Sequence, residues 1–359
     1  MLYNLFLSLS NELTALNVFR YITFRIILAS LTSMFLWFIF GQKFIGVIKA
    51  FQMRQYIREE GPASHQKKAG TPTMGGILVL GAAFVSCLLW ADLSSKVVWL
   101  MWIVTFAYAL IGFQDDYLKA RRKRNQGLSG RQKLTAQVII GLLAGIYLYL
   151  TPGFSPTLTF PGLKSLVINL GPFYALFASL VLVSTSSAVN LTDGLDGLAI
   201  GPLIMAAGTY MVFAYCAGNS VIANYLQIPG VPGASELAVV LASLIGAGLG
   251  FLWFNSFPAD IFLGDVGSLS LGGALGLAAL IVKQELVLIL VGGLFVIEAL
   301  SVIFQVAFFK TFGGRRLFRM APLHHHFELK GWPEPKVIIR FWIIAIILGL
   351  AGLSTLKLR

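Results

Sequence analysis

The sequence predicts an all-α polytopic membrane protein, and three observations lead to that class. Hydrophobic residues make up 57% of the 359 residues, and the mean hydropathy is +0.81. Charged residues make up only 12%, against about 25% in soluble domains. Apolar runs of roughly 17–25 residues, long enough to cross a bilayer as helices, recur along the chain. We expect a single integral membrane domain over residues 1–359, because no linker or low-complexity tract divides the chain.

About ten apolar runs are candidates for transmembrane helices. They start near residues 22, 72, 96, 133, 171, 198, 236, 261, 286 and 337. The run at 261 is rich in glycine, and the run at 286 contains Glu298, so these two differ most from ordinary spans. Residues 1–19 are expected to form a short helix at the membrane interface.

The distribution of positive charge predicts the orientation of the bundle. The segments 43–71, 115–133 and 309–336 carry six, seven and six of the 27 lysines and arginines, whereas 218–235 carries no charge. With ten spans these three segments fall on one side, and the positive-inside rule makes that side cytoplasmic. Both termini are then periplasmic. The net charge of +12 therefore indicates contact with membrane lipids or an anionic substrate, and no nucleic acid is expected as a partner.

A first polar cluster precedes the second apolar run. Thr71 and Pro72 have the pattern of a helix N-cap followed by proline in the first turn. A helix starting there would direct free N–H groups toward the cytoplasm beside Lys67 and Lys68, which favours an anion site that also includes Thr73. The alternative is an ordinary capped membrane helix.

A second cluster lies at the cytoplasmic end of the third run. Asp115 and Asp116 are adjacent, and neighbouring carboxylates repel each other unless a proton or a cation lies between them. Such oxygen ligands suit Mg²⁺. Lys119 follows Asp115 by four residues and shares its helix face. The alternative is a pair of interface acids that neutralise the basic run behind them.

The loop 190–197 holds three polar residues spaced three apart. One helical turn would place Asn190, Asp193 and Asp196 on one side. Thr192 or Asp193 could cap the following helix, but capping explains only one acid. The three together indicate a binding role.

A fourth group follows the run that ends near residue 255. Asp265 stands at the mouth of an apolar helix between glycines that let a ligand approach the backbone. Acids at membrane depth are costly and point to function. Asn255, Phe262 and Ser268 belong to the same stretch, although a phenylalanine alone more often serves packing.

The last cytoplasmic loop contains the triplet His324, His325 and His326. Consecutive residues of a helix point about 100° apart, so the three cannot all bind one ion, and a zinc site is not expected. One or two of them could donate to a phosphate or a base. The alternative is an amphipathic interfacial segment carrying Phe327 and Trp332.

These groups converge on the cytoplasmic face of a helical bundle. Acids for Mg²⁺, bases for phosphate and a membrane location favour phosphoryl transfer between a cytosolic donor and a lipid acceptor. A membrane transporter is the alternative outside the enzymes. Transport sites usually lie near the bilayer midplane, whereas these acids gather at one face.

The ordered motifs at 70–76, 115–116, 190–197, 264–268 and 322–328 resemble those of the polyprenyl-phosphate N-acetylhexosamine-1-phosphate transferases. The histidine triplet and the length match the branch that uses UDP-N-acetylmuramoyl-pentapeptide. A sister transferase that uses UDP-N-acetylglucosamine is the alternative within the family.

The resemblance implies transfer of phospho-N-acetylmuramoyl-pentapeptide to undecaprenyl phosphate, which gives lipid I and UMP in peptidoglycan synthesis. It also implies Mg²⁺ as cofactor, a homodimer, and a multi-pass location in the bacterial inner membrane. By the resemblance, the catalytic acids are Asp115, Asp116 and Asp265, of which Asp265 holds Mg²⁺ and the other two manage the acceptor phosphate or the metal. The expected substrate-binding residues are Lys68, Thr73, Lys119, Asn190, Asp193, Asp196, Asn255, Phe262, Ser268, His324 and His325.

Overall fold

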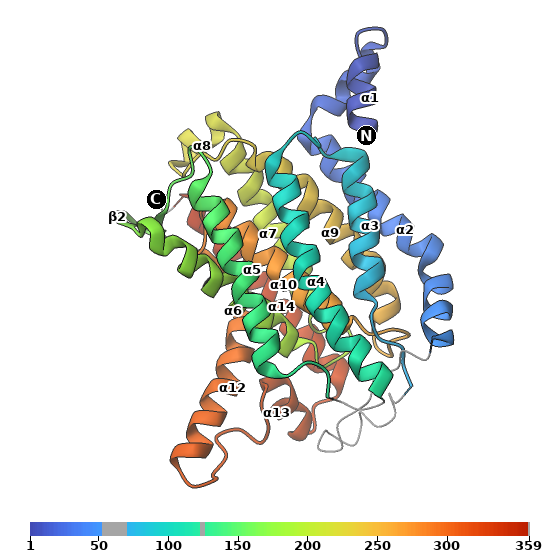
Figure 1. Cartoon of the computed structure of the whole chain (residues 1–359), viewed down its shortest axis with the longest axis vertical. Coiled ribbons are helices and arrows are strands. Elements are labelled where there is room, and N and C mark those ends of the chain that lie inside the picture. Colours follow the sequence, from blue (N-terminus) through green and yellow to red (C-terminus); the bar gives the residue numbers. More distant parts are fainter. Residues whose placement is uncertain (52–69, 123–125, 358–359) are drawn as a thin grey trace.

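The computed structural model describes residues 1–51, 70–122 and 126–357, and the chain within these ranges is a helical bundle (Figure 1). Nine helical segments of this described part are long and apolar enough to cross a membrane. They are α2 (Ile22–Ala50), α4 (Lys96–Arg122), α5 (Gly130–Leu150), α6 (Tyr174–Thr192), α7 (Ile200–Gly218), α9 (Ala234–Asn255), α10 (Gly264–Ile281), α12 (Gly293–Thr311) and α14 (Glu334–Ser354). A shorter apolar helix, α3 (Gly76–Trp90), completes the bundle.

Each expected apolar run thus has a helix within it or beside it, and the predicted all-α polytopic class is confirmed. The run expected near 286 is interrupted at Gly292, which separates α11 (Val287–Val291) from α12. The N-terminal residues form the expected short helix, followed by a 3₁₀ turn. The remaining short helices are α1 (Leu2–Leu9), η1 (Thr14–Arg20), η3 (Gly171–Phe173), α8 (Ser220–Leu226), α13 (Leu323–Leu329) and η4 (Thr355–Lys357).

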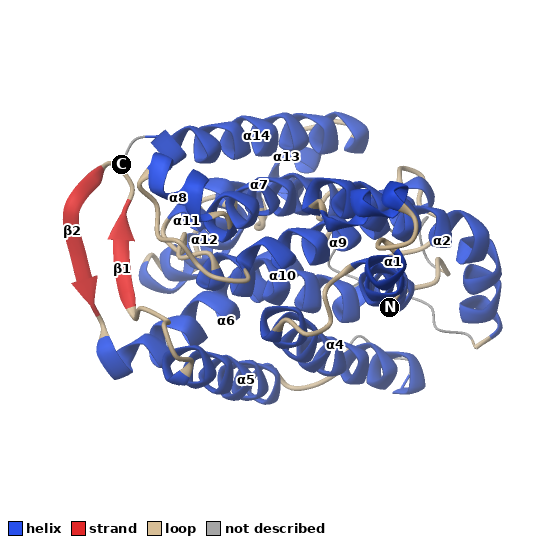
Figure 2. Ribbon diagram, turned by 90° about the horizontal axis from the view of Figure 1, so that it is seen from above, coloured by secondary structure: helices blue, strands red, loops and turns tan. Residues whose placement is uncertain are grey.

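A two-stranded hairpin interrupts the helical pattern between α5 and α6. β1 (Thr157–Phe160) pairs antiparallel with β2 (Leu163–Asn169), with an irregularity after Thr159. Figure 2 shows it at the periphery of the bundle, away from the central helices. The sequence prediction did not include these strands.

The outer helices carry apolar side chains on their exposed faces. Ile27, Leu143, Ile303 and Leu350 are each more than half exposed although they are aliphatic. Apolar surface of this extent is rare on soluble monomers, and in a bilayer it contacts lipid tails. The exposed faces therefore support the membrane assignment independently of hydropathy.

The central helix is α10, whose residues are almost all buried. It packs against α4 and α6, and Figure 2 shows it between these helices and α7 and α9. Close packing depends on glycine: a Cβ at Gly112 of α4 would overlap the backbone of Asp265 and Val266. This approach brings the acids of α4 next to the first turn of α10.

The predicted start of the second span is wrong. Instead of capping a helix, residues 71–75 are non-helical, and α3 begins at Gly76. The N–H groups of Gly75 and Gly76 donate to the carbonyls of Phe262 and Leu263, each at 2.9 Å, and the N–H of Phe262 donates to Pro72 O. These amides are already paired, so the expected free N–H anion site does not form at these two residues.

Both termini lie at one end of the bundle. The N-terminal ammonium contacts the carbonyl of Leu88 near the end of α3, and Lys357 lies over the ring of Tyr225 in α8. The basic last turns of α2, α4 and α12 lie toward the opposite end (Figure 1). This arrangement agrees with termini on the side away from the basic segments; the periplasmic identity of that side stays a prediction.

A buried ion pair joins the helices at the end that bears the termini. The Arg25 guanidinium donates to both carboxylate oxygens of Glu236 at 2.6 and 2.8 Å, and the N–H of Asp92 donates to the same carboxylate at 2.9 Å. Arg25 is 2% exposed and also donates to the Trp90 carbonyl. The pair fixes α2, α9 and the turn after α3 relative to one another.

Removing one partner of this pair is expected to destabilise the bundle strongly. Glu236→Gln leaves the guanidinium buried without a counter-charge, which costs about 3–5 kcal/mol of the free energy of unfolding. Denaturation in detergent, followed by tryptophan fluorescence, measures the loss. Replacing both partners by methionine is the control and should restore much of the stability. Unchanged unfolding of Glu236→Gln would show that the pair contributes little.

Candidate active site

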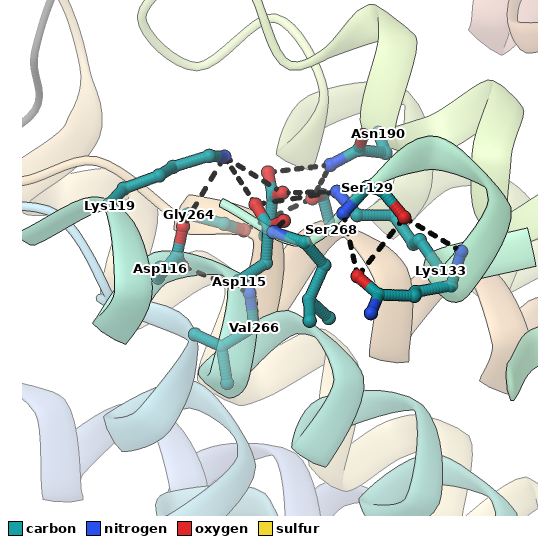
Figure 3. Close-up of polar contacts among 12 residues, drawn as sticks. Asp115, Asp116, Lys119, Ser129, Lys133, Asn190, Gly264, Val266 and Ser268 are labelled. Carbon is teal, nitrogen blue, oxygen red and sulfur yellow. Dashed lines mark hydrogen bonds and ion pairs between the residues drawn. The ribbon is translucent and has the colours of Figure 1, made fainter. Parts of the chain in front are cut away.

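Four helix ends bring polar and charged side chains together (Figure 3), at the end of the bundle opposite the termini (Figure 1). Asp265, in the first turn of α10, lies at the centre. Its Oδ2 accepts from Lys119 Nζ at 3.0 Å and from Lys133 Nζ at 2.7 Å, and its Oδ1 accepts from Asn190 Nδ2 at 2.9 Å. Asn190 also donates to Ser268 Oγ at 2.8 Å. Helices α4, α5, α6 and α10 thus meet at one carboxylate.

Asp115 and Asp116 lie beside this carboxylate on α4. They are 1% and 5% exposed. Asp115 Oδ2 contacts Lys119 Nζ at 2.5 Å, and Asp115 Oδ1 accepts from the N–H of Leu128 at 2.8 Å. Asp116 Oδ2 accepts from the N–H of Val266 at 3.2 Å. The predicted adjacency of both acids to Asp265 is therefore present.

The cluster has the composition of a site for a hard divalent cation. Oxygens of Asp115, Asp116 and Asp265 lie within 4.8 Å of one another. Three carboxylates face two ammonium groups, so one negative charge is left over. Asp115 Oδ2 is buried and has an ion-pair partner but no well-directed hydrogen bond. Oxygen ligands with incomplete neutralisation suit Mg²⁺, and these three residues could hold it.

Lys133 is a site residue that the predicted set omits. It lies in the first turn of α5, directly after the capping box formed by Ser129 and Gln132. A cation at a helix N-terminus opposes the helix dipole, so its position needs an acidic partner elsewhere. That unfavourable placement is the signal in the sequence that could have identified it.

The loop after α6 lines the neighbouring wall. Asn190 is still helical, and Asp193 follows the end of α6 at Thr192. Burial, reinforced by the negative charges of Asp265 and Asp196, raises the pKa of Asp193 to about 8. Asp193 is thus mostly protonated at neutral pH and can donate a hydrogen bond. The expected capping of the next helix is wrong, because the N-cap position of α7 is Ala199 and receives no side-chain cap.

Two of the predicted nucleotide-binding side chains also connect protein loops. Asn255 accepts from the N–H of Gly197 at 2.9 Å and donates to the carbonyl of Ile261 at 2.8 Å. Asp196 accepts from the N–H of Ala259 at 3.0 Å. Both are buried. They hold the loops 190–197 and 256–263 together, whatever contact they make with a ligand.

The remaining predicted residues of the first and fourth motifs differ in how far their side chains are buried. Thr73 is buried. A Cβ on Gly264 would lie 2.9 Å from the Thr73 hydroxyl and 2.6 Å from Asp116 Oδ2, so both groups lie beside this glycine. Phe262 is only half-buried and remains open to a ligand. Lys68 lies outside the described residues.

The members of the histidine triplet contact different side chains. His324 is buried and contacts Glu298, whereas His325 Nδ1 lies 2.8 Å from Glu328 Oε2. His326 accepts from the N–H of Arg319, and burial together with nearby Lys330 and Arg319 lowers its pKa. The three rings therefore contact different partners, although the centroids of the His324 and His325 rings lie only 4.2 Å apart. That the three do not share one ion stays a prediction. The contact between Glu298 and His324 was not predicted.

Comparison with known proteins identifies the family. Residues 98–283 match Glycosyl transferase family 4, and residues 68–80 match the phospho-N-acetylmuramoyl-pentapeptide-transferase signature 1. Proteins named phospho-N-acetylmuramoyl-pentapeptide-transferase are 57% identical in Desulfatibacillum aliphaticivorans, 54% in Syntrophus aciditrophicus and 55% in a Geobacter species, over 100% of both chains in each case. The chain therefore belongs to the phospho-N-acetylmuramoyl-pentapeptide-transferase family.

Proposed function

We propose that this protein transfers phospho-N-acetylmuramoyl-pentapeptide from its UDP donor to undecaprenyl phosphate in the bacterial inner membrane. The products are lipid I and UMP, a step of peptidoglycan synthesis. One observation carries the proposal: Asp115, Asp116 and Asp265 meet Lys119 and Lys133 at the end of a membrane bundle. Full-length similarity to transferases of this name supports the choice of donor and acceptor.

Two anionic substrates must meet at this cluster. Lys119 comes from α4 and Lys133 from α5, and both ammonium groups contact Asp265 and Asp115. Phosphate oxygens bound at these carboxylates would therefore lie within reach of two positive charges. Mg²⁺, held by the three acids, would neutralise the charge that develops on the leaving phosphate. Asn190 orients Asp265 through its amide. The loop 190–197 and Phe262 would bind the nucleotide. The proposal also includes the homodimer that is expected from the family.

We infer that the lipid phosphate attacks the donor directly. The second pKa of a phosphate monoester is near 6, so the acceptor is mostly a dianion at neutral pH and needs little help from a base. Both oxygens of Asp115 are engaged, one by the N–H of Leu128 and the other by Lys119, which makes it a poor nucleophile. Its role is to orient and to balance charge.

A direct attack predicts that no phosphorylated enzyme accumulates. With donor labelled in the sugar phosphate and no acceptor present, acid-quenched protein should carry no label on Asp115 or Asp265. The complete reaction run in parallel is the positive control. Recovery of a labelled aspartyl peptide would contradict the one-step scheme.

Release of UMP tests the function itself. Purified protein supplied with undecaprenyl phosphate, Mg²⁺ and UDP-N-acetylmuramoyl-pentapeptide should release UMP and form the lipid product, because the acids and lysines converge where two phosphates can meet. Asp265→Asn should lower turnover by at least about 10²-fold, since a ligand and a charge partner are lost. Asp260→Asn, an exposed acid of the adjacent loop, is the matched control.

The same assay separates the alternatives. UDP-N-acetylglucosamine as the preferred donor would identify a sister transferase. Uptake of the sugar nucleotide into vesicles without UMP release would identify a transporter. Wild-type turnover and Mg²⁺ dependence in Asp265→Asn would contradict the metal assignment.

The raised pKa of Asp193 predicts a pH-dependent stability effect. An acid whose pKa rises from 3.8 in the unfolded chain to about 8 in the folded protein makes the folded state take up a proton, so this group destabilises the protein increasingly as the pH rises from 4 to 8. Asp193→Asn removes the effect. Its melting temperature should match the wild type near pH 4 and exceed it increasingly toward pH 8.

Thermal unfolding in buffered detergent across this range measures the difference. Asp260→Asn again serves as the control and should show no such divergence with pH. A constant difference between Asp193→Asn and the wild type at all pH values would contradict the assignment.

A further inference from the structure

A fully buried glutamate in the membrane helix α12 contacts the histidine motif. Glu298 is 0% exposed and lies in the second turn of α12, whereas His324 is 1% exposed and is the second residue of α13. Glu298 Oε1 accepts from the backbone N–H of His324 at 3.1 Å, and Glu298 Oε2 lies 3.1 Å from His324 Nδ1. One carboxylate therefore holds both the backbone and the ring of this histidine.

With Glu298 ionised and the imidazole of His324 neutral, this geometry determines which ring nitrogen carries the proton. An ionised carboxylate can only accept hydrogen bonds, and neutral imidazole has one donor and one acceptor nitrogen. Because Glu298 Oε1 is used by the backbone N–H, Glu298 Oε2 is left to accept from the ring, and Nδ1 of His324 must be the protonated nitrogen. Nε2 then presents its lone pair on the opposite edge of the ring.

That opposite edge is buried and unpaired. Among the described residues, His324 Nε2 has no hydrogen-bond partner although it is inaccessible to solvent. It faces Gly194 in the loop 190–197, and a Cβ at that position would overlap it. Buried polar atoms almost always have a partner. The missing partner indicates that a ligand group completes this contact, and the absence of a side chain at Gly194 lets the loop backbone lie directly against the nitrogen.

We propose that Glu298 is a positioning residue for the donor nucleotide, which it serves through His324. It holds the imidazole with Nδ1 protonated, so that Nε2 beside Gly194 accepts a hydrogen bond from an N–H or O–H group of the uridine. The proposal rests on the proposed use of a UDP-linked donor. It gives a role to an acid buried in an apolar helix, where an unused charge would only be costly.

Glu298→Gln changes the proton arrangement while keeping the shape. The amide has one acceptor oxygen, which the backbone N–H of His324 requires, so the amide NH₂ group must face Nδ1. Nδ1 then becomes an acceptor, and the proton moves to Nε2. The uridine would meet a donor where it needs an acceptor. We expect the donor KM and the Kd of UMP to rise about tenfold.

The kinetic pattern distinguishes this role from a general structural one. Because the contact is equally present before and during the reaction, kcat and the KM for undecaprenyl phosphate should change less than about twofold. Glu285→Gln is the matched control: that glutamate is also buried, but it pairs with Lys283 and Tyr174 away from the acidic cluster. It should leave both nucleotide constants unchanged.

Two further measurements make the proposal falsifiable without activity. Selective ¹⁵N labelling of histidine should show the proton of His324 on Nδ1 in the wild type and on Nε2 in Glu298→Gln. In a His324→Ala background, Glu298→Gln should not weaken UMP binding further, since the residue through which it acts is gone. An unchanged tautomer, or an undiminished loss in the His324→Ala background, overturns the proposal.

Gly194→Ala provides a test that does not alter Glu298. Its methyl carbon would overlap Nε2 unless the loop or the ring shifts, so the substitution should weaken UMP binding while His324 keeps its proton on Nδ1. UMP binding equal to that of the wild type would overturn the proposal. Loss of UMP release with all donors would contradict the proposed function alone, because the tautomer and the UMP affinity are measured separately.

Discussion

The structure depends on the neutralisation of Asp265 inside a bundle that otherwise excludes charge. Its carboxylate accepts from Lys119, Lys133 and Asn190, which come from α4, α5 and α6. Charge in a membrane bundle is costly unless it is paired, so these helix ends must arrive together. Gly112 permits the closest of these approaches. The position of α10 at the centre follows from the same requirement, since it carries the acid that the other helices serve.

The neutralisation of the acidic cluster is incomplete, and the negative charge that remains accounts for its function. Two lysines cannot balance Asp115, Asp116 and Asp265, so the cluster attracts a cation. The same lysines can turn to phosphate oxygens when substrates arrive, because ammonium groups on flexible stems exchange partners at little cost. A site balanced internally would have no reason to bind either metal or phosphate. The loop 190–197 lies beside the cluster, and its Asp193, whose pKa is raised to about 8, can donate a hydrogen bond there without adding a full negative charge.

The sequence predicts those features that are local. Run length predicts the spans, and the acids of three motifs (115–116, 190–197 and 264–268) lie, as expected, at one end of the bundle. Errors arise where a distant segment competes. Thr71 and Pro72 look like a helix start, but the amides of Gly75 and Gly76 pair with a segment nearly 190 residues later in the chain. Lys133 and Glu298 were missed as site residues for the same reason, since their partners Asp265 and His324 lie on other helices.

The hydrogen-bond partners of the buried glutamates distinguish structural acids from an acid that serves the site. Among the described residues, Glu236, Glu285 and Glu298 are all buried, and a hydropathy profile treats each as an anomaly. Two of the carboxylates are matched: Glu236 by Arg25 and by the N–H of Asp92, Glu285 by Lys283 and Tyr174. Nε of Arg25 is nevertheless buried without a hydrogen-bond partner. The third holds a histidine whose far nitrogen has no partner. The unpaired nitrogen of Arg25 belongs to the ion pair at the end that bears the termini, whereas that of His324 lies against Gly194 in the loop 190–197. Only the second position is suited to a ligand of the candidate active site, and this location separates Glu298 from the other two.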